Sequence, residues 1–151
     1  MSFSKILKDT INCPKICVFY YIEHRRKLKP LADIQFKYTD NKAINFPALV
    51  DSGADRSCSF VSIGEKLGVD FSDYDEKDNV ATGISGADVP GYIAPISFFI
   101  GDYEITLNVA WMDIPFDAEK HYFFILGRER FFEEFDVIFQ ESKTRIVFKK
   151  V

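Results

Sequence analysis

The sequence is poor in residues that hold metals or form disulfide frameworks, with three cysteines and two histidines in 151 residues. An odd number of cysteines suits a reducing compartment better than a secreted disulfide scaffold. Cys13 and Cys17 have a C-x3-C spacing, but no second pair of Cys or His completes a tetrahedral site. We therefore expect neither a metal nor another cofactor.

Long apolar runs and a net positive charge are also missing. No stretch approaches the roughly 20 apolar residues that cross a bilayer, and the first residues, with Lys5 and Lys8, lack a signal-peptide core. A net charge of -4 argues against a nucleic-acid partner. The one basic cluster, residues 24–29, is interpreted as a solvated loop. These features predict a cytoplasmic protein that binds neither membranes nor nucleic acid.

The chain contains no internal repeat and no Pro/Gly/Ser-rich linker, so one compact domain is expected. The sequence changes character near residue 30. We divide the chain into an extension of unknown role, residues 1–30, and a domain at residues 31–151. Residues 2–12 of the extension are compatible with a helical turn or a frayed arm.

Sixteen Phe and seven Tyr favour strands and large buried contacts. The predicted strands lie in residues 15–23, 31–40, 42–51, 91–113, 136–140 and 145–150, with hairpin turns at 40–42, 101–102 and 141–144. In the 31–40 strand, Asp33, Gln35 and Lys37 alternate with apolar residues, which predicts one solvent-exposed, wet face and one buried face. One short helix is expected in residues 59–70, limited by Gly64 and Gly68, and 128–135 is compatible with another; 73–79 is a charged loop. The fold class is therefore mostly β, a closed barrel or packed sheets, with one or two short helices.

The segment "ALVDSGADRS" ends an apolar run on the carboxylate of Asp51. An isolated Asp-Ser-Gly is an ordinary turn or helix cap. Here two further segments follow in order. The first is "ATGISGADVPGYIAPISFFIGD", a Gly-rich tip between strand-like flanks, and the second is "FFILGRERFFEEFDVIFQESKTRIVF", an apolar-Gly-Arg run before a short helix and a hairpin.

Together these segments resemble the retropepsin-like aspartic proteases, the retroviral type and its cellular relatives. The resemblance covers residues 31–150 and implies a closed β-barrel equivalent to half of an acid protease. It implies that Asp51 is catalytic and that Ser52, Gly53, Ala54 and Asp55 support it. It also implies that Asp55 forms an ion pair with Arg128, and that a flap at about 81–92, with Gly83, Ile84, Ser85 and Gly86, closes over a peptide.

The chain contains one Asp-Ser-Gly motif, and therefore half of a catalytic pair. Two neighbouring carboxylates can share one proton and act as base and acid in amide hydrolysis. The family brings two copies of one residue together in a C2 homodimer. The resemblance therefore predicts a homodimeric aspartic endopeptidase that needs no cofactor.

Other interpretations remain open at this point. The same fold could serve as a catalytically silent peptide-binding or dimerisation module. Residues 83–87, "GISGA", are similar to a nucleophile elbow, although the second Gly comes one position early. Cys58 could be a thiol nucleophile with His24 or His121, although a lone Cys is more often a buried apolar residue.

Overall fold

The computed structural model describes residues 16–37, 43–82 and 86–151. Its strands are β1 (Ile16–Tyr20), β2 (Ile22–His24), β3 (Lys27–Lys29), β4 (Leu31–Lys37), β5 (Ala43–Val50), β6 (Ser57–Phe60), β7 (Lys77–Thr82), β8 (Asp88–Ile100), β9 (Tyr103–Met112), β10 (Phe124–Leu126), β11 (Phe135–Gln140) and β12 (Arg145–Lys150). The helices are α2 (Val61–Lys66) and α3 (Phe131–Glu134), with single 3-10 turns at Phe71–Asp73 and Glu141–Lys143. In these ranges no helix has the length and apolar character of a membrane span.

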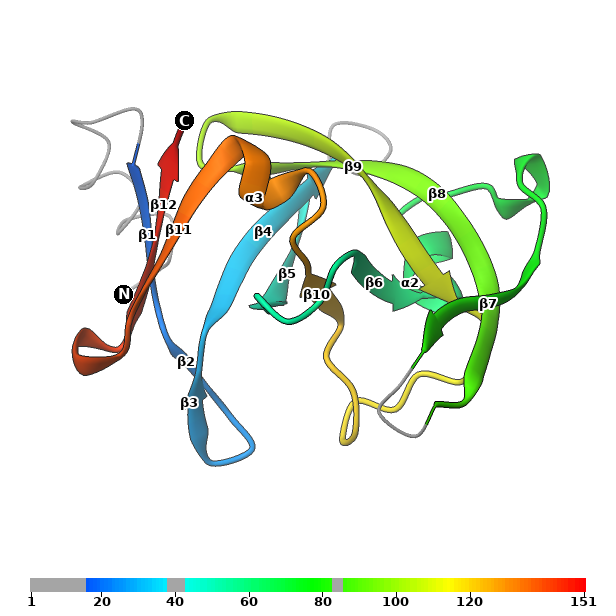
Figure 1. Ribbon diagram of the computed structural model, residues 1–151, viewed down its shortest axis with the longest axis horizontal. Helices are drawn as coiled ribbons and strands as arrows, with labels where there is room; N and C mark the ends of the chain where they lie inside the picture. The colour runs from blue at the N-terminus through cyan, green and yellow to red at the C-terminus, as the bar shows by residue number, and fades with distance from the viewer. Residues whose placement is uncertain (1–15, 38–42, 83–85) are drawn as a thin grey trace.

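Six strands form a closed barrel (Figure 1), in the order β4, β5, β10, β6, β9, β8 and back to β4. The ring closes where Gln35 and Phe36 of β4 pair with Phe99 and Phe98 of β8. Strand β7 lies outside the ring and extends β8 as a hairpin. The predicted mostly-β barrel with short helices is confirmed.

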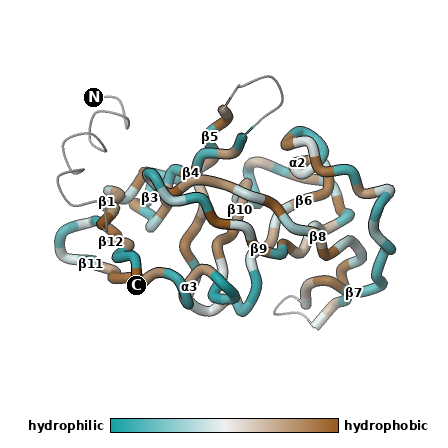
Figure 2. The backbone as a smooth tube through the Cα atoms, turned by 90° about the horizontal axis from the view of Figure 1, so that it is seen from above, coloured by the Kyte–Doolittle hydropathy of each residue, from teal (hydrophilic) through white to brown (hydrophobic). Residues whose placement is uncertain are grey.

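Apolar and polar residues alternate along β4, so that one face of this barrel strand is buried and the other faces solvent. In β4, Ile34 and Phe36 are fully buried while Gln35 and Lys37 are exposed, so the predicted wet face is present. The ring of Phe36 lies 5.5 Å from that of Phe98 and 5.6 Å from that of Phe124. These ring contacts pack β4, β8 and β10 together in one core. The segments at the surface are hydrophilic instead, as Figure 2 shows for the β11–β12 turn and the loop before β7.

The longest hairpin, β8 and β9, turns at Gly101 and Asp102 as predicted. Gly101 has a φ of +57°, which costs a glycine little because it has no Cβ. The helix predicted in 59–70 is α2, but Gly64 lies inside it rather than limiting it. A Cβ on Gly64 would be 2.7 Å from the ring of Phe71, so this glycine permits close packing there. The other predicted helix is confined to α3, because Arg130, with a φ of +68°, precedes it and β11 follows directly.

A second sheet lies beside the barrel, in the order β1, β12, β11. The expected C-terminal hairpin of β11 and β12 is present, and β1 adds to it in antiparallel pairing. Phe19 of β1 and Phe148 of β12 are fully buried in the core that the barrel shares. The strand predicted over 15–23 is divided at Tyr21, after which β2 and β3 form a separate two-stranded arm.

Candidate active site

Asp51 lies in the loop between β5 and β6, and the strand β10 separates these two strands in the sheet. Strand β10 pairs in parallel with β5 and in antiparallel with β6, so the loop joining β5 to β6 must pass around the end of β10. Asp51 is the first residue of that loop, and its amide donates to the carbonyl of Leu126 at 3.0 Å. The half-buried carboxylate therefore lies at the crossing of three strands.

The loop holds the Asp51 side chain in one orientation. The amide of Gly53 donates to Asp51 Oδ1 at 2.9 Å, and the amide of Ala54 donates to the Asp51 carbonyl at 3.2 Å. A Cβ on Gly53 would be 3.2 Å from Asp51 Oδ1, so this position favours glycine. Ser52 and Gly53 are exposed, which leaves this side of the loop open to a substrate or a second chain.

A second segment, residues 127–129, braces the loop. The amides of Arg128 and Glu129 donate to the carbonyls of Ala54 and Asp55 at 2.8 and 2.7 Å. The amide of Gly127 donates to Oγ of Ser57 at 2.9 Å, and Ser57 is buried. Sequence reasoning missed Ser57 and the function of Gly127, and the available signal was a glycine placed directly after a short apolar run.

In the part of the chain that the structure describes, Asp55 and Arg128 do not form the expected ion pair. The salt bridge between these segments joins Arg56 Nε to Glu129 Oε2 at 2.7 Å. Both expected partners are exposed, where an ion pair stabilises a protein little and side chains are free to take other rotamers. Asp55 and Arg128 nevertheless line one cavity of about 480 Å³ together with Glu129, Phe132 and Glu133.

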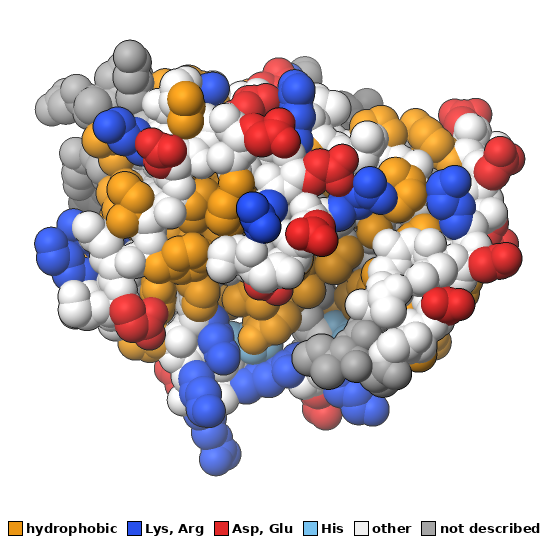
Figure 3. Space-filling view, in the orientation of Figure 1, with side chains coloured by type: hydrophobic (Ala, Val, Ile, Leu, Met, Phe, Trp, Pro, Cys, Tyr) orange, Lys and Arg blue, Asp and Glu red, His pale blue; other side chains and the backbone are white. Residues whose placement is uncertain are grey.

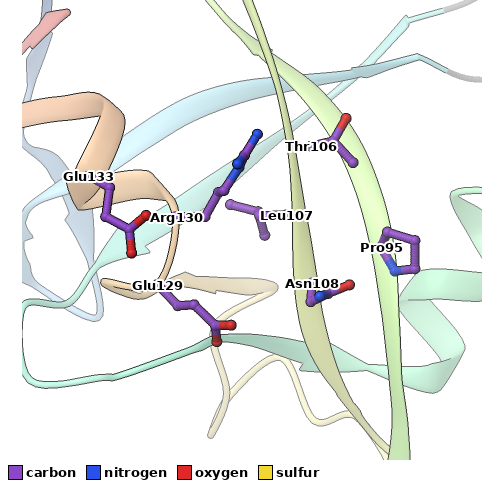
Figure 4. A pocket seen from close by; sticks show the side chains of 7 residues that line it. All are labelled: Pro95, Thr106, Leu107, Asn108, Glu129, Arg130 and Glu133. Atoms are coloured by element: carbon purple, nitrogen blue, oxygen red, sulfur yellow. The ribbon is translucent and has the colours of Figure 1, made fainter. Parts of the chain in front are cut away.

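A neighbouring cavity of about 370 Å³ lies on the outer side of the β8–β9 hairpin (Figure 4). Its walls include Leu107 and Asn108 of β9, and Glu129 and Glu133 from the segment around α3. The two cavities share these glutamates. None of the residues predicted for the site lines this second cavity.

Of the predicted flap, Gly83, Ile84 and Ser85 lie outside the described residues, and so do the first three residues of the "GISGA" segment. On either side of them, β7 and β8 pair through Thr82 with Asp88 and Ala81 with Val89. The side chain of Asn79 accepts from the amide of Val89 at 3.2 Å. Gly86 is exposed and has a φ of +73°.

The described cysteines have the properties of buried thiols. Burial, and then the charge of Asp51, raises the pKa of Cys58 to about 11, so its thiol is protonated at neutral pH. Within the described ranges neither histidine hydrogen-bonds to the Cys58 thiol: His24 packs on Tyr122, and His121 Nδ1 accepts from the amide of Asp117. Cys13 lies outside the described residues, and no three His, Cys, Asp or Glu side chains gather for a metal in the ranges described.

Comparison with known proteins gives no match to a family model and no match among curated proteins. Two solved structures are similar. A retropepsin-like aspartic protease from Rickettsia conorii shares 16% identity over 90% of this chain and 92% of its own, with a TM-score of 0.54. The retroviral protease-like domain of Ddi1 from Leishmania major shares 14% identity over 83% of this chain and 96% of its own, with a TM-score of 0.53. The resemblance stated from the sequence is confirmed at the level of the fold: this chain has the retropepsin-like fold.

Proposed function

We propose that the chain is a homodimeric aspartic endopeptidase in which two copies of Asp51 activate one water. The observation that carries the proposal is the place of Asp51, at the crossing of β5, β6 and β10, with one carboxylate oxygen fixed by the Gly53 amide. A carboxylate held this way is preorganised for catalysis, because its rotamer is set before a substrate arrives.

In the proposed reaction, the two carboxylates share one proton. The ionised member takes a proton from the water as it attacks the peptide carbonyl, and the protonated member donates to the carbonyl oxygen. The Asp51 that took the proton from water then gives it to the nitrogen, and the C–N bond breaks as the other Asp51 takes a hydroxyl proton from the tetrahedral intermediate. The products are a carboxylic acid and an amine, and the pair again holds one proton. The described fold needs no third catalytic side chain for these steps.

Dimerisation is part of the proposal, because one chain supplies one Asp51. The outer edge of β11 supports it, since no other strand of the described ranges pairs there. Ile138 and Phe139 on this strand are 43% and 39% exposed, and exposed apolar residues on an unpaired edge favour pairing with another chain. A C2 arrangement brings the same residue from both subunits to one axis.

We propose that the β7–β8 hairpin carries the flap that closes over the substrate. The pairing of Thr82 with Asp88 supports a hairpin here, and its closure over the Asp51 loop is proposed to exclude water from the reaction. Ser52 is proposed to brace the loop across the axis, and its exposure in the single chain is compatible with that role. Asp55 and Arg128 are proposed to contact substrate backbone in their shared cavity.

The test is cleavage of a denatured protein mixture from acidic to neutral pH by the wild type and by Asp51→Asn. We expect the variant to lose activity by about a hundredfold or more, because it cannot act as base or acid. Circular dichroism of both proteins controls for folding. Activity that survives the substitution would contradict the proposed mechanism, and peptide binding without any cleavage would favour the silent binding module.

A further inference from the structure

The arm formed by β2 and β3 starts directly beside the candidate catalytic residue. The carbonyl of Pro30, the residue after the arm, accepts from the amide of Val50 at 3.0 Å, and Val50 precedes Asp51. From this base the arm projects at the lower edge of the molecule in Figure 1, where the loop after β9 also lies. The arm therefore forms a side of the region that an extended substrate would cross.

The arm is fixed to the loop between β9 and β10. The ring of His24 lies 4.8 Å from that of Tyr122, and Arg25 Nη2 donates to the carbonyl of His121 at 3.3 Å. The guanidinium of Arg25 also lies 5.6 Å from the centre of the Tyr122 ring. This loop leads into β10, which borders the Asp51 loop, so both ends of the arm are tied to the candidate site.

The arm carries a concentrated positive charge. Arg25, Arg26, Lys27 and Lys29 lie within five residues of a chain whose net charge is -4. Figure 3 shows Lys and Arg side chains gathered over the arm at the same lower edge. Within the described ranges, none of these four cations forms an ion pair. Burial, followed by the charges of Arg25 and Lys29, lowers the pKa of His24, which keeps its ring neutral and able to pack on Tyr122.

The two-residue turn at the tip of the arm places Arg25 and Arg26 in a strained backbone conformation. His24 pairs with Lys27, so Arg25 and Arg26 form a two-residue turn, with φ values of +51° and +64°. Such turns favour Asn-Gly, because a Cβ is unfavourable in the left-handed region. Backbone strain that is retained often marks a functional position. Here the retained side chains are two guanidinium groups, which bind carboxylates through paired hydrogen bonds.

From the position, the unpaired charge and the strained turn, we infer that the arm binds acidic side chains of the peptide substrate. This inference rests on the proposed function, and it adds a preference for Asp and Glu on either side of the cleaved bond. Lys29 lies at the base of the arm, next to Pro30. Arg25 and Arg26 lie at its tip, about four to five residues before Pro30 in the sequence. At about 3.3 Å per residue, the acidic positions fall roughly three to five residues from the cleaved bond. A C2 dimer places one arm on each side.

The surface of the arm favours a peptide over a nucleic acid. Glu23 and the 54% exposed Leu28 pair with each other on the opposite face from His24, so the basic surface is a narrow stripe. A phosphate backbone is bound by a wide basic surface on a protein of positive charge. An extended peptide with a few carboxylates matches this narrow stripe.

The experiment measures binding to the full-length Asp51→Asn protein, so that no cleavage interferes. The probes are two fluorescein-labelled extended peptides with an apolar centre, one with glutamates near both ends and its twin with glutamines. We expect the acidic peptide to bind about fivefold or more tightly, and the difference to shrink as salt is added. Arg25→Asn/Arg26→Gly should lose the difference, because Asn-Gly suits the turn but carries no charge.

Two further variants separate charge from shape. Arg25→Lys/Arg26→Lys keeps the charge and should keep a preference for the acidic peptide. Lys66→Gln/Lys143→Gln removes the same charge from exposed positions in α2 and in the β11–β12 turn, and should also keep it. Equal binding of the two peptides, binding of neither, or a preference that survives in the Asn-Gly variant would overturn the inference. Stronger displacement by a single-stranded oligonucleotide than by unlabelled acidic peptide would also overturn it. Failure of the inference leaves Asp51-dependent cleavage unaffected, so the two proposals can fail separately.

Discussion

Gly127 is the residue at which one added carbon would disturb the candidate site most directly. A Cβ there would lie 2.5 Å from the carbonyl carbon of Arg56 and 2.7 Å from its oxygen. These are backbone atoms of the Asp51 loop, so they cannot yield by a rotamer change. We predict that Gly127→Ala destabilises the protein by about 1–3 kcal/mol and displaces the loop. Urea denaturation and the peptide-cleavage assay measure the two effects.

Ser57→Ala is the matched control for Gly127→Ala, because it leaves the backbone contact intact and removes only the acceptor of the Gly127 amide. Its expected cost is about 1–3 kcal/mol, the range for a buried donor left without a partner. A smaller loss of cleavage is expected in this control than in Gly127→Ala. Wild-type stability and cleavage in Gly127→Ala would contradict the proposed bracing of the loop.

Asp51 could be predicted from the sequence and Ser57 could not, because the partner of Ser57, Gly127, is distant along the chain. The motif around Asp51 is local, so its order of residues can be read directly. The hydrogen bond between Gly127 and Ser57 joins residues 70 positions apart, and it depends on how β10 inserts between β5 and β6. The pairing of Arg56 with Glu129 depends on the rotamers of exposed side chains, which a sequence pattern does not specify.

At the scale of elements, the arm of β2 and β3 gives a prediction about stability that does not depend on any substrate. Arg25→Asn/Arg26→Gly replaces two arginines in the left-handed region, where each costs on the order of 1 kcal/mol, by Asn, which tolerates this region, and by Gly, which has no Cβ. The loss of the Arg25 contacts to Tyr122 and His121 offsets part of the gain. We expect a net increase of about 1 kcal/mol in the free energy of unfolding, measured with urea. Arg25→Lys/Arg26→Lys keeps the Cβ atoms and should bring no gain, and a less stable Asn-Gly variant would show that the turn is not strained.

A second element-scale prediction concerns the junction of β1 and β2 with the β11–β12 turn. The hydroxyl of Tyr21 donates to Glu141 Oε2 at 2.8 Å. Burial, this hydrogen bond and the charge of Glu141 raise the pKa of Tyr21 from 10.0 to about 12. A raised pKa favours the protonated form in the folded state, so its contribution to stability is complete below pH 10 and is lost as the pH rises toward 12. Tyr21→Phe should therefore lose less stability over this range than the wild type, and urea midpoints at both ends of it measure the difference.

The strands were more predictable than the way in which they assemble. Alternation in β4 and the Gly101 turn of β8 and β9 are local signals, and both were confirmed. The short β10 has three residues and no alternation to identify it, yet its place between β5 and β6 creates the candidate site. The division at Tyr21 and the positive φ of Arg130 depend on tertiary packing that overrides local preference.

At the scale of the whole molecule, the proposed activity requires two chains, and the edge of β11 is where we expect them to meet. Pairing of β11 with its copy across a two-fold axis would extend the β1-β12-β11 sheet from each side and cover Ile138 and Phe139. Ile138→Lys places a charge on this surface in both subunits, because a C2 interface uses every residue twice. At about 1 kcal/mol per copy, dimer dissociation should become roughly 30-fold easier.

Sedimentation velocity over a range of protein concentrations measures this shift, and peptide cleavage at the same concentrations should fall in parallel with the dimer fraction. Tyr74→Lys is the matched control, because Tyr74 is 38% exposed in the loop before β7, away from the β1-β12-β11 sheet. The control should sediment and cleave as the wild type does. A wild-type protein that cleaves as a monomer, or an Ile138→Lys protein that stays dimeric, would place the second Asp51 or the interface elsewhere. Full activity in a monomer would also remove the reason for pairing two carboxylates, since one chain holds only one Asp-Ser-Gly motif.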